Sequence, residues 1–436
     1  MRLIDPKKGR LINLNASAKY ILSLCDGKHS VKSIKNLVAK KYGLAVEQVD
    51  KDVEKFLLSA YEEGIVSFGE EEKSGEDKEV KKGRAIYWEI TKRCNLKCKH
   101  CYASSSLLGR ELDLKEIERI LKESKELGVD SVTLTGGEPL IREDVWEIME
   151  LCLVHKMKLS IITNATLIDT LTARKLAKLP IHLQVSMDGT KKEVYEFVRG
   201  EGIFDVFMKG LNNLLEEGLA PRTTLALTIM KPNAFYLRDF FAFAERVGIK
   251  NLHFSWLQYQ GNAKYNWECL ALTVKEQVKV ALYLFKLTRS NKHFEVSGDL
   301  CKNYLSSFTN PYLPQEGSLP CPLGHNPYID AYGNVYGCQL FSDLNYKLGN
   351  SREEPLGEIL DSSNIYRRYH SLVLRPWHIP ECKHCRYLPF CRGGCPAEAV
   401  SFFADPLAPS PSCNMAKAMF RYFIRCLIKN KNFLSD

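Results

Sequence analysis

The sequence lacks a long hydrophobic run. No stretch approaches the roughly 20 apolar residues that span a bilayer, and the first residues, Met1 to Asp5, lead into Pro6-Lys7-Lys8 rather than into the apolar core of a signal peptide. These absences argue against a membrane protein and against export. We therefore expect a cytoplasmic protein, and a length of 436 residues predicts two or three domains.

The sequence also lacks the stripe of basic and aromatic side chains that is typical of nucleic-acid binding. The formal net charge is +9, but the Lys and Arg residues are scattered among Glu and Asp. We therefore expect no nucleic-acid partner and no membrane partner. A modest preference for acidic partners is all that the charge predicts.

Cysteine, in contrast, is abundant, with 15 residues in the chain. Without a secretory signal, this number favours metal ligation over disulfides. Cys94, Cys98 and Cys101 follow directly on the strand-like run 86–91. Three thiolates can hold three corners of a four-iron cluster and leave the fourth iron open for chemistry. The alternative is a zinc site completed by His100, which is disfavoured because His100 is adjacent to Cys101.

The spacing of Cys94, Cys98 and Cys101 resembles the signature of the radical SAM superfamily. A second motif follows the apolar strand 131–134, where Gly136 and Gly137 allow close backbone approach and the Glu138 carboxylate can receive a cationic amine. This motif resembles the methionine-binding turn of the same superfamily. The resemblance implies that S-adenosylmethionine binds the open iron and is cleaved reductively to methionine and a 5′-deoxyadenosyl radical. It also implies an electron donor such as ferredoxin or flavodoxin.

Strand-like and helix-like stretches alternate from about residue 84 to 258, which predicts an α/β fold with a parallel sheet in a domain that spans 84–295. The resemblance implies a partial (β/α)6 radical SAM barrel, with functional groups at the C-terminal ends of its strands. Helices are expected at 114–126 and 233–247. The expected strands are 86–91, 131–135, 158–163, 181–186, 222–230 and 251–256.

Polar residues at other strand ends are candidate contacts to S-adenosylmethionine. Asn164, Ser186 and Asp188 could hold the ribose hydroxyls or the adenine side. Arg199 resembles the contact of the superfamily to the carboxylate of S-adenosylmethionine. The alternative for each is an ordinary strand-end polar group or a salt-bridging arginine.

A cysteine-rich segment follows at 296–436, with Gly333 in a stretch, Asp330 to Asn334, that has the chemistry of a hairpin turn. The spacing of Cys321, Cys338, Cys382-x2-Cys385-x5-Cys391-x3-Cys395 and Cys413 resembles the SPASM extension. That extension binds two auxiliary four-iron clusters and would bring the total to three [4Fe-4S] clusters. A zinc ribbon is the alternative. Cys301 is a candidate fourth ligand of the second auxiliary cluster, which could instead have three cysteines and an exchangeable site. The resemblance assigns Cys382, Cys385, Cys391 and Cys413 to one cluster and Cys321, Cys338 and Cys395 to the other. Cys25, Cys152, Cys269 and Cys426 lie in helical or apolar stretches and are expected to be packing residues.

Residues 1–68 predict a small winged-helix-like α+β module, with short extended pieces followed by three helices. Ser30 is a plausible N-cap of the second helix and Gly43 its stop. The module resembles the peptide chaperones of pyrroloquinoline quinone biosynthesis, which bind the leader of a precursor peptide as an added strand. A DNA-binding module is the alternative, but the third helix is acidic. The charged stretch 69–83 is expected to be a linker. The three helices are expected to bury apolar faces made of Ala18, Ile21 and Leu22, then Ile34, Leu37, Val38 and Tyr42, then Val49, Val53, Phe56, Leu57 and Ala60.

Together these features predict a radical enzyme that oxidatively modifies a ribosomally made precursor peptide, by forming a C–S or C–C bond or an oxidised product. Two other enzyme classes stay open, a modifier of porphyrin side chains and a sulfatase-type maturase. Those maturases place a carboxylate base after the cysteine that corresponds to Cys338, where this chain has Gln339, an amide that cannot take a proton. A non-catalytic iron–sulfur or zinc scaffold is disfavoured, because it has no use for an open three-cysteine site beside a Gly-Gly-Glu-Pro turn.

Overall fold

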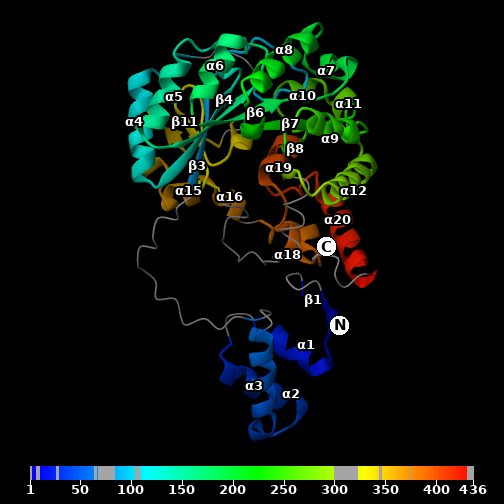
Figure 1. Ribbon diagram of the computed structural model, residues 1–436. Helices are drawn as coiled ribbons and strands as arrows, with labels where there is room; N and C mark the ends of the chain where they lie inside the picture. The colour runs from blue at the N-terminus through cyan, green and yellow to red at the C-terminus, as the bar shows by residue number, and fades with distance from the viewer. Residues whose placement is uncertain are drawn as a thin grey trace. The chain divides into compact units, whose positions relative to one another are not determined.

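The structure is a computed structural model that describes residues 2–5, 10–25, 29–62, 66, 84–103, 109–298, 323–342, 346–373 and 375–429 (Figure 1). The chain divides into two compact units, one made mainly of Met1–Glu79 and the other of Val80–Ser307 and Tyr312–Phe420. The expected linker 69–83 lies outside the described residues. No helix among the described residues is long and apolar enough to cross a membrane.

The N-terminal unit contains a hairpin and three helices, as the sequence predicted. Strands β1 (Arg2–Asp5) and β2 (Arg10–Asn13) pair antiparallel, and helices α1 (Ala16–Ser23), α2 (Val31–Tyr42) and α3 (Val46–Glu62) follow. The Ser30 side chain caps α2 by accepting a hydrogen bond from the Ser33 N–H at 3.1 Å. Gly43 ends α2 in the left-handed conformation. Both expected helix ends are therefore confirmed.

The predicted apolar faces of these helices meet in one small core, which contains Ile21, Ile34, Val38, Val49, Val53 and Leu57. Leu22 and Leu37 are only partly buried, and Tyr42 departs furthest from the expectation. It was expected on the buried face of α2 but is 41% exposed. It is the last residue of the helix, where the core has ended, and its ring lies edge-on against Tyr20 at 6.4 Å between ring centroids.

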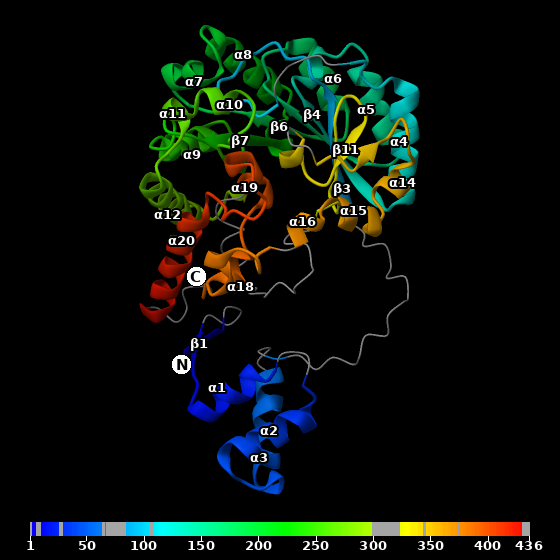
Figure 2. The same ribbon diagram turned by 180° about the vertical axis from the view of Figure 1, so that it is seen from behind.

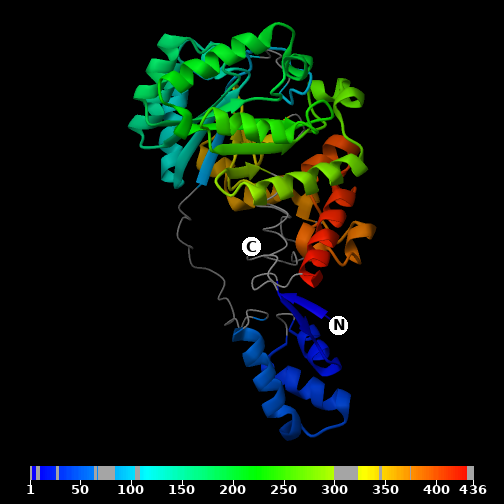
Figure 3. The same cartoon turned by 45° about the vertical axis from the view of Figure 1, so that its right-hand side comes forward.

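The second unit is built on a ten-stranded sheet in the order β12-β11-β10-β3-β4-β5-β6-β7-β8-β9. All pairings from β10 to β9 are parallel. Figure 3 shows helices on the outside of the curved sheet, so the expected α/β barrel is confirmed. The strands are β3 (Arg84–Thr91), β4 (Val129–Gly136), β5 (Lys158–Thr163), β6 (Ile181–Ser186), β7 (Thr223–Ile229), β8 (Asn251–Trp256), β9 (Glu295–Gly298), β10 (Tyr328–Ile329), β11 (Asn334–Tyr336) and β12 (Gly349–Asn350).

The sheet has one apolar and one polar face, because side chains alternate along a strand. Trp88, Leu134, Ile161 and Leu183 are aligned neighbours in successive strands, and all are at most 1% exposed. One residue earlier in each strand, the same register aligns Tyr87, Thr133, Ser160 and His182, which are polar and partly exposed. The apolar face is the one that the helices can bury, which leaves the inside of the barrel polar.

The helices that cover the barrel begin where their sequences provide caps. Helix α4 has the expected bounds and starts at a capping box of Asp113 and Glu116. Helix α9 was expected from Asn233 but starts at Leu237, because the Asn233 side chain bonds Met230 N–H and the carbonyls of Asp188 and Thr228 instead. The bounds are α4 (Leu114–Glu126), η1 (Pro139–Ile141), α5 (Val145–Val154), α6 (Thr170–Lys178), α7 (Lys192–Arg199), α8 (Ile203–Glu216), η2 (Ala220–Arg222), α9 (Leu237–Arg246), α10 (Asn262–Tyr265), α11 (Trp267–Leu270) and α12 (Val274–Ser290).

The cysteine-rich segment joins the barrel through its hairpin. Strand β10 pairs in parallel with β3, and β11 returns antiparallel to it across a turn in which Gly333 has φ +86° (Figure 2). The expected hairpin turn is therefore confirmed. The other elements of the segment are η3 (Gln339–Phe341), α14 (Leu356–Ile359), α15 (Ser362–Arg368), α16 (His370–Val373), α17 (Pro380–Lys383), α18 (Leu388–Cys391), α19 (Pro396–Phe403) and α20 (Cys413–Lys429).

Candidate active site

The three cysteines of the first motif lie together in the loop that leaves the C-terminal end of β3. Cys94, Cys98 and Cys101 are each partly buried. Burial and the nearby Cys98 thiol raise the pKa of Cys101 to about 12, and burial also raises the pKa values of Cys94 and Cys98. Thiols in such surroundings become thiolates when iron binds them. The donor set therefore fits a cluster with three protein ligands.

This cysteine loop is held from outside by two asparagines that the sequence analysis did not single out. Asn262 donates its backbone N–H to the Cys101 carbonyl at 2.8 Å and its side-chain amide to the Cys98 carbonyl at 3.1 Å. Asn266 donates to the Lys99 carbonyl at 3.3 Å. The two lie four residues apart around α10, a spacing too common to reveal a role without the structure.

The glycines of the second motif bring its turn against the cysteine loop. Gly137 N–H donates to the Thr91 carbonyl at 2.8 Å, and Glu138 N–H donates to the Arg93 carbonyl at 2.9 Å. A Cβ atom on Gly137 would lie 2.0 Å from the Arg93 oxygen. The close approach that two glycines permit is thus made to the backbone just before Cys94.

Glu138 is a fully buried carboxylate with three internal donors. Its Oε1 accepts hydrogen bonds from Leu140 N–H at 3.2 Å and from the Thr163 hydroxyl at 2.9 Å, and its Oε2 accepts one from Asn164 N–H at 2.7 Å. Burial nevertheless raises the pKa of Glu138 to about 7. A carboxylate has about four acceptor positions, so Oε2 retains one for an amine.

Asn164 and Ser186 occupy the strand ends where the sequence placed them. Asn164 is 6% exposed, and its amide donates to the Asn95 side chain at 3.0 Å, so it steadies the cysteine loop as well as following β5. Ser186 ends β6 and is partly buried. Both residues lie at the C-terminal edge of the sheet, on neighbouring strands.

Arg199 forms a buried ion pair. Its Nε and Nη2 atoms lie 2.8 and 2.7 Å from Asp188 Oδ2, and the two side chains are 7% and 1% exposed. Asp188 also lies 3.3 Å from His100 Nε2 and accepts the Thr228 N–H. The structure thus gives Arg199 the salt bridge that was its alternative interpretation. The guanidinium has five N–H groups, which leaves donors for a carboxylate as well.

Some of the cysteines predicted to hold the auxiliary clusters lie near one another in the structure. Burial, then the neighbouring Cys391 and Cys413 thiols, raise the pKa of Cys382 to about 11, with a smaller effect from Cys385. Helix α19, which begins after Cys395, packs against η3, which begins after Cys338. Among the described residues no three His, Cys, Asp or Glu side chains are arranged to hold a single metal ion. Cys301 and Cys321 lie outside the described residues.

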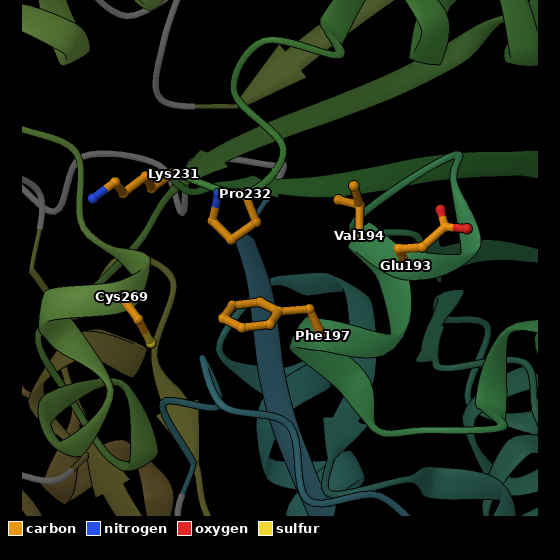
Figure 4. Close-up of a pocket in the computed structure, with 6 residues that line it drawn as sticks. All are labelled: Glu193, Val194, Phe197, Lys231, Pro232 and Cys269. Carbon is orange, nitrogen blue, oxygen red and sulfur yellow. The ribbon is translucent and has the colours of Figure 1, made fainter.

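The four cysteines expected in packing positions differ from one another. Cys152 is buried, and Cys25 and Cys426 are partly buried. Cys269 is exposed, so that expectation was wrong for it. It belongs to the short helix α11 and lines a cavity of about 360 Å³ with Glu193, Val194, Phe197, Lys231 and Pro232 (Figure 4).

Comparison with protein-family models finds three matches along the chain. The radical SAM superfamily matches residues 88–244, coenzyme PQQ synthesis protein D matches residues 1–66, and the SPASM iron–sulfur cluster-binding domain matches residues 321–386. Mycofactocin maturase MftC of Mycobacterium ulcerans (strain Agy99) is 30% identical over 337 residues, which cover 75% of this chain and 87% of that protein. Fe-coproporphyrin III synthase of Methanosarcina barkeri is 28% identical over 362 residues, 78% of this chain and 89% of that protein.

Solved structures show the same fold. Streptococcus suis SuiB bound to precursor peptide SuiA has a TM-score of 0.60 and 17% identity, covering 94% of this chain and 99% of that one. The enzyme anSMEcpe with bound S-adenosylmethionine and a Cp18Cys peptide has a TM-score of 0.63 and 22% identity, covering 80% and 98%. At these identities the likeness concerns the fold alone.

Proposed function

The chain belongs to the radical SAM superfamily, with a SPASM domain and a PqqD-type module, and on that premise we propose that it is a maturase of a ribosomally made precursor peptide. It is an enzyme, and its cofactors are [4Fe-4S] clusters and S-adenosylmethionine. When bound together, these cofactors supply a 5′-deoxyadenosyl radical that removes a hydrogen atom from the substrate. The reaction proposed is the oxidative formation of a C–S or C–C bond, in which the substrate would then lose a proton to solvent and its second electron to an auxiliary cluster.

The residues at the C-terminal edge of the barrel have separate roles in this proposal. Cys94, Cys98 and Cys101 hold the cluster that binds S-adenosylmethionine. Glu138 Oε2 would accept a hydrogen bond from the amine of S-adenosylmethionine. Arg199 would donate hydrogen bonds to the carboxylate of S-adenosylmethionine, while Asp188 keeps the guanidinium in place. Asn164 and Ser186 hold the ribose from neighbouring strand ends.

The cysteines of the C-terminal segment supply the auxiliary cluster ligands. In our proposal Cys382, Cys385, Cys391 and Cys413 hold one auxiliary cluster, and Cys321, Cys338 and Cys395 hold a second, with Cys301 as its candidate fourth ligand. The residue after Cys338 is Gln339. An amide cannot accept the proton that a base must remove to make an aldehyde, which supports bond formation over formylglycine chemistry. A ferredoxin or flavodoxin would supply the first electron.

One observation carries the choice of a peptide substrate. The N-terminal unit is a folded module with its own core, and it matches a peptide-chaperone family over residues 1–66. Such a module binds an extended leader and so raises the local concentration of the core peptide at the barrel. A porphyrin needs no leader, so the module would have no purpose in that reaction.

The test is to assay the anaerobically reconstituted protein with dithionite and the short peptides encoded beside its gene. We expect 5′-deoxyadenosine together with a peptide that has lost two hydrogen atoms. Both products should disappear in Cys98→Ala, and 5′-deoxyadenosine should be strongly reduced in Glu138→Ala because the amine contact is lost. Modification of the peptide by Cys98→Ala would contradict the assignment of the loop.

Modification of a porphyrin side chain is the second candidate, because Fe-coproporphyrin III synthase and AdoMet-dependent heme synthases are also similar to this chain at 25–28% identity. The same assay with Fe-coproporphyrin III in place of the peptide decides between the two. Decarboxylated porphyrin and an unchanged peptide would overturn the maturase proposal.

A further inference from the structure

The cavity lined by Cys269 lies between three elements beside the cysteine loop. Glu193, Val194 and Phe197 come from α7, Lys231 and Pro232 from the turn after β7, and Cys269 from α11. Figure 4 shows the Phe197 ring in the middle, with Lys231 and Cys269 on one side of it and Glu193 on the other. We call these six residues the α7–α11 surface.

This surface is joined directly to the cysteine loop. Lys99 stands next to Cys98, and its Nζ lies 3.7 Å from the centroid of the Phe197 ring. Lys99 N–H donates to the Val198 carbonyl at 2.9 Å, and Lys231 N–H donates to the Leu270 carbonyl at 2.8 Å. Val198, Leu270 and Met230 form one buried cluster beneath the surface. The surface is therefore a fixed part of the fold rather than a loose loop.

Helix α7 separates this surface from the side where S-adenosylmethionine is proposed to bind. Arg199 and Tyr195 are buried, and Arg199 pairs with Asp188 on the inner side. Phe197 is 41% exposed, and Glu193 is exposed with it on the outer side. A protein docked on the outer side of α7 would lie close to the cysteine loop and would not occupy the inner side, where S-adenosylmethionine is proposed to bind.

The charge and the exposed rings near this surface favour an acidic protein partner. Lys231 and Lys97 are exposed and Lys99 is partly exposed, against two exposed carboxylates, Glu193 and Glu268, the latter next to Cys269. Phe235, in the same turn as Lys231, is 64% exposed. Exposed aromatic rings are typical of the core of a protein–protein interface. Lysines around such a core typically form a charged rim that speeds association with an oppositely charged partner. The chain as a whole has a formal charge of +9, which adds to the attraction of an acidic protein.

We propose that the α7–α11 surface docks an acidic one-electron carrier protein of the flavodoxin or ferredoxin type. The carrier gives up one electron to the cluster held by Cys94, Cys98 and Cys101, so the carrier is oxidised and the cluster reduced by one electron each, with no proton transferred. This inference rests on the proposed function only in requiring a redox-active cluster at that loop.

Two opposite charge changes test the proposal on the reconstituted enzyme, with a bacterial flavodoxin hydroquinone as the probe. Lys231→Glu should weaken binding, measured by calorimetry at low salt, and slow cluster reduction about tenfold, because a rim charge acts mainly on association. Glu193→Lys should strengthen binding and speed reduction. Lys250→Glu is the matched control, since Lys250 is exposed just before β8 at the opposite end of the strands.

Dithionite, which needs no docking surface, gives the second control. With dithionite all four proteins should cleave S-adenosylmethionine at the same rate, and high salt should erase the differences seen with flavodoxin. Equal flavodoxin binding and equal reduction rates in all four proteins would overturn the proposal. So would a loss of dithionite-driven peptide modification in Lys231→Glu with flavodoxin binding unchanged, because the surface would then belong to the peptide. Cluster reduction is measured without peptide, so failure of the maturase proposal does not disturb this test.

Discussion

Thiols that are buried near one another differ from isolated packing cysteines in what they can bind. Burial raises the pKa of all four thiols, but Cys94, Cys98 and Cys101 share one loop, whereas Cys152 is buried alone in α5. Neighbouring thiolates repel one another unless a cation lies between them, and iron supplies that cation. Proximity, more than burial, therefore marks the cluster ligands.

Iron content follows from this distinction. Three four-iron clusters amount to about twelve irons per chain after anaerobic reconstitution. Replacing Cys94, Cys98 and Cys101 by Ala should leave about eight, because the auxiliary cysteines are untouched. Cys152→Ala is the control and should keep about twelve. Four irons in the unmodified protein, or stoichiometric zinc, would contradict the auxiliary clusters.

The second residue-scale prediction concerns Gly137. A methyl group there would lie 2.0 Å from the Arg93 carbonyl oxygen, so Gly137→Ala must displace the backbone that leads to Cys94. We expect loss of about four irons and of 5′-deoxyadenosine formation, while the eight auxiliary irons remain. Gly357→Ala is the control, since its new methyl group would meet its nearest described neighbour at 3.8 Å. Normal iron content and activity in Gly137→Ala would show that the turn need not touch the loop.

At the scale of elements, Glu116 is one of the α4 side chains that link this helix to the cysteine-rich segment. Glu116 Oε1 accepts hydrogen bonds from Arg352 Nε at 2.8 Å and Arg110 Nη2 at 2.7 Å, and Oε2 accepts the Asp113 N–H. Burial alone would raise the pKa of Glu116, but these donors together lower it to about 2. Arg352 also donates to the Tyr332 carbonyl in the hairpin turn. The ionised carboxylate thus holds the hairpin against α4.

Stability should respond to pH accordingly. Since folding lowers the pKa of Glu116, its contribution is complete above the ordinary value near 4.5 and is lost as the pH falls from there toward about 2. We expect Glu116→Gln to lower the free energy of unfolding by about 1–2 kcal/mol at pH 7. The difference from wild type, measured by urea unfolding, should shrink across that acidic range. Glu118→Gln should have a much smaller effect, because Glu118 pairs with Lys122 on the exposed face of the same helix. A difference that persisted at the acid end would show that the effect is not electrostatic.

At the scale of the whole molecule, the chain consists of two units with separate cores. If the N-terminal unit only holds the leader, deleting residues 1–68 should leave slow cleavage of S-adenosylmethionine intact. Modification of a full-length precursor should fall sharply, because tethering no longer raises its local concentration. Supplying the excised module in trans at high concentration should restore part of the activity.

The measurement compares 5′-deoxyadenosine and modified peptide for the full-length and truncated proteins. A precursor without its leader is the control substrate, since the two proteins should treat it alike. Equal modification of the full-length precursor by both proteins would show that the module does not bind the leader.

The sequence by itself determined the features that depend on neighbouring residues. The spacing of Cys94, Cys98 and Cys101, the alternation of strands and helices, and the Ser30 and Gly43 helix ends are local, because backbone geometry over a few residues decides them. The six central strands were predicted almost to their ends, since each is a compact run of β-forming residues. The short strands β9 to β12 could not be found in this way, because runs of two to four residues carry no readable period.

Only the tertiary structure decided which distant residues meet. It pairs Arg199 with Asp188, brings Asn262 to the cysteine loop and sets the N–H of Asn164 on the Glu138 carboxylate. It also leaves Cys269 exposed, although the sequence predicted a packing residue at this position. These contacts depend on the register of parallel strands and on how helices lie across the sheet. Both are settled by the collective packing of the barrel, which no short stretch of sequence contains.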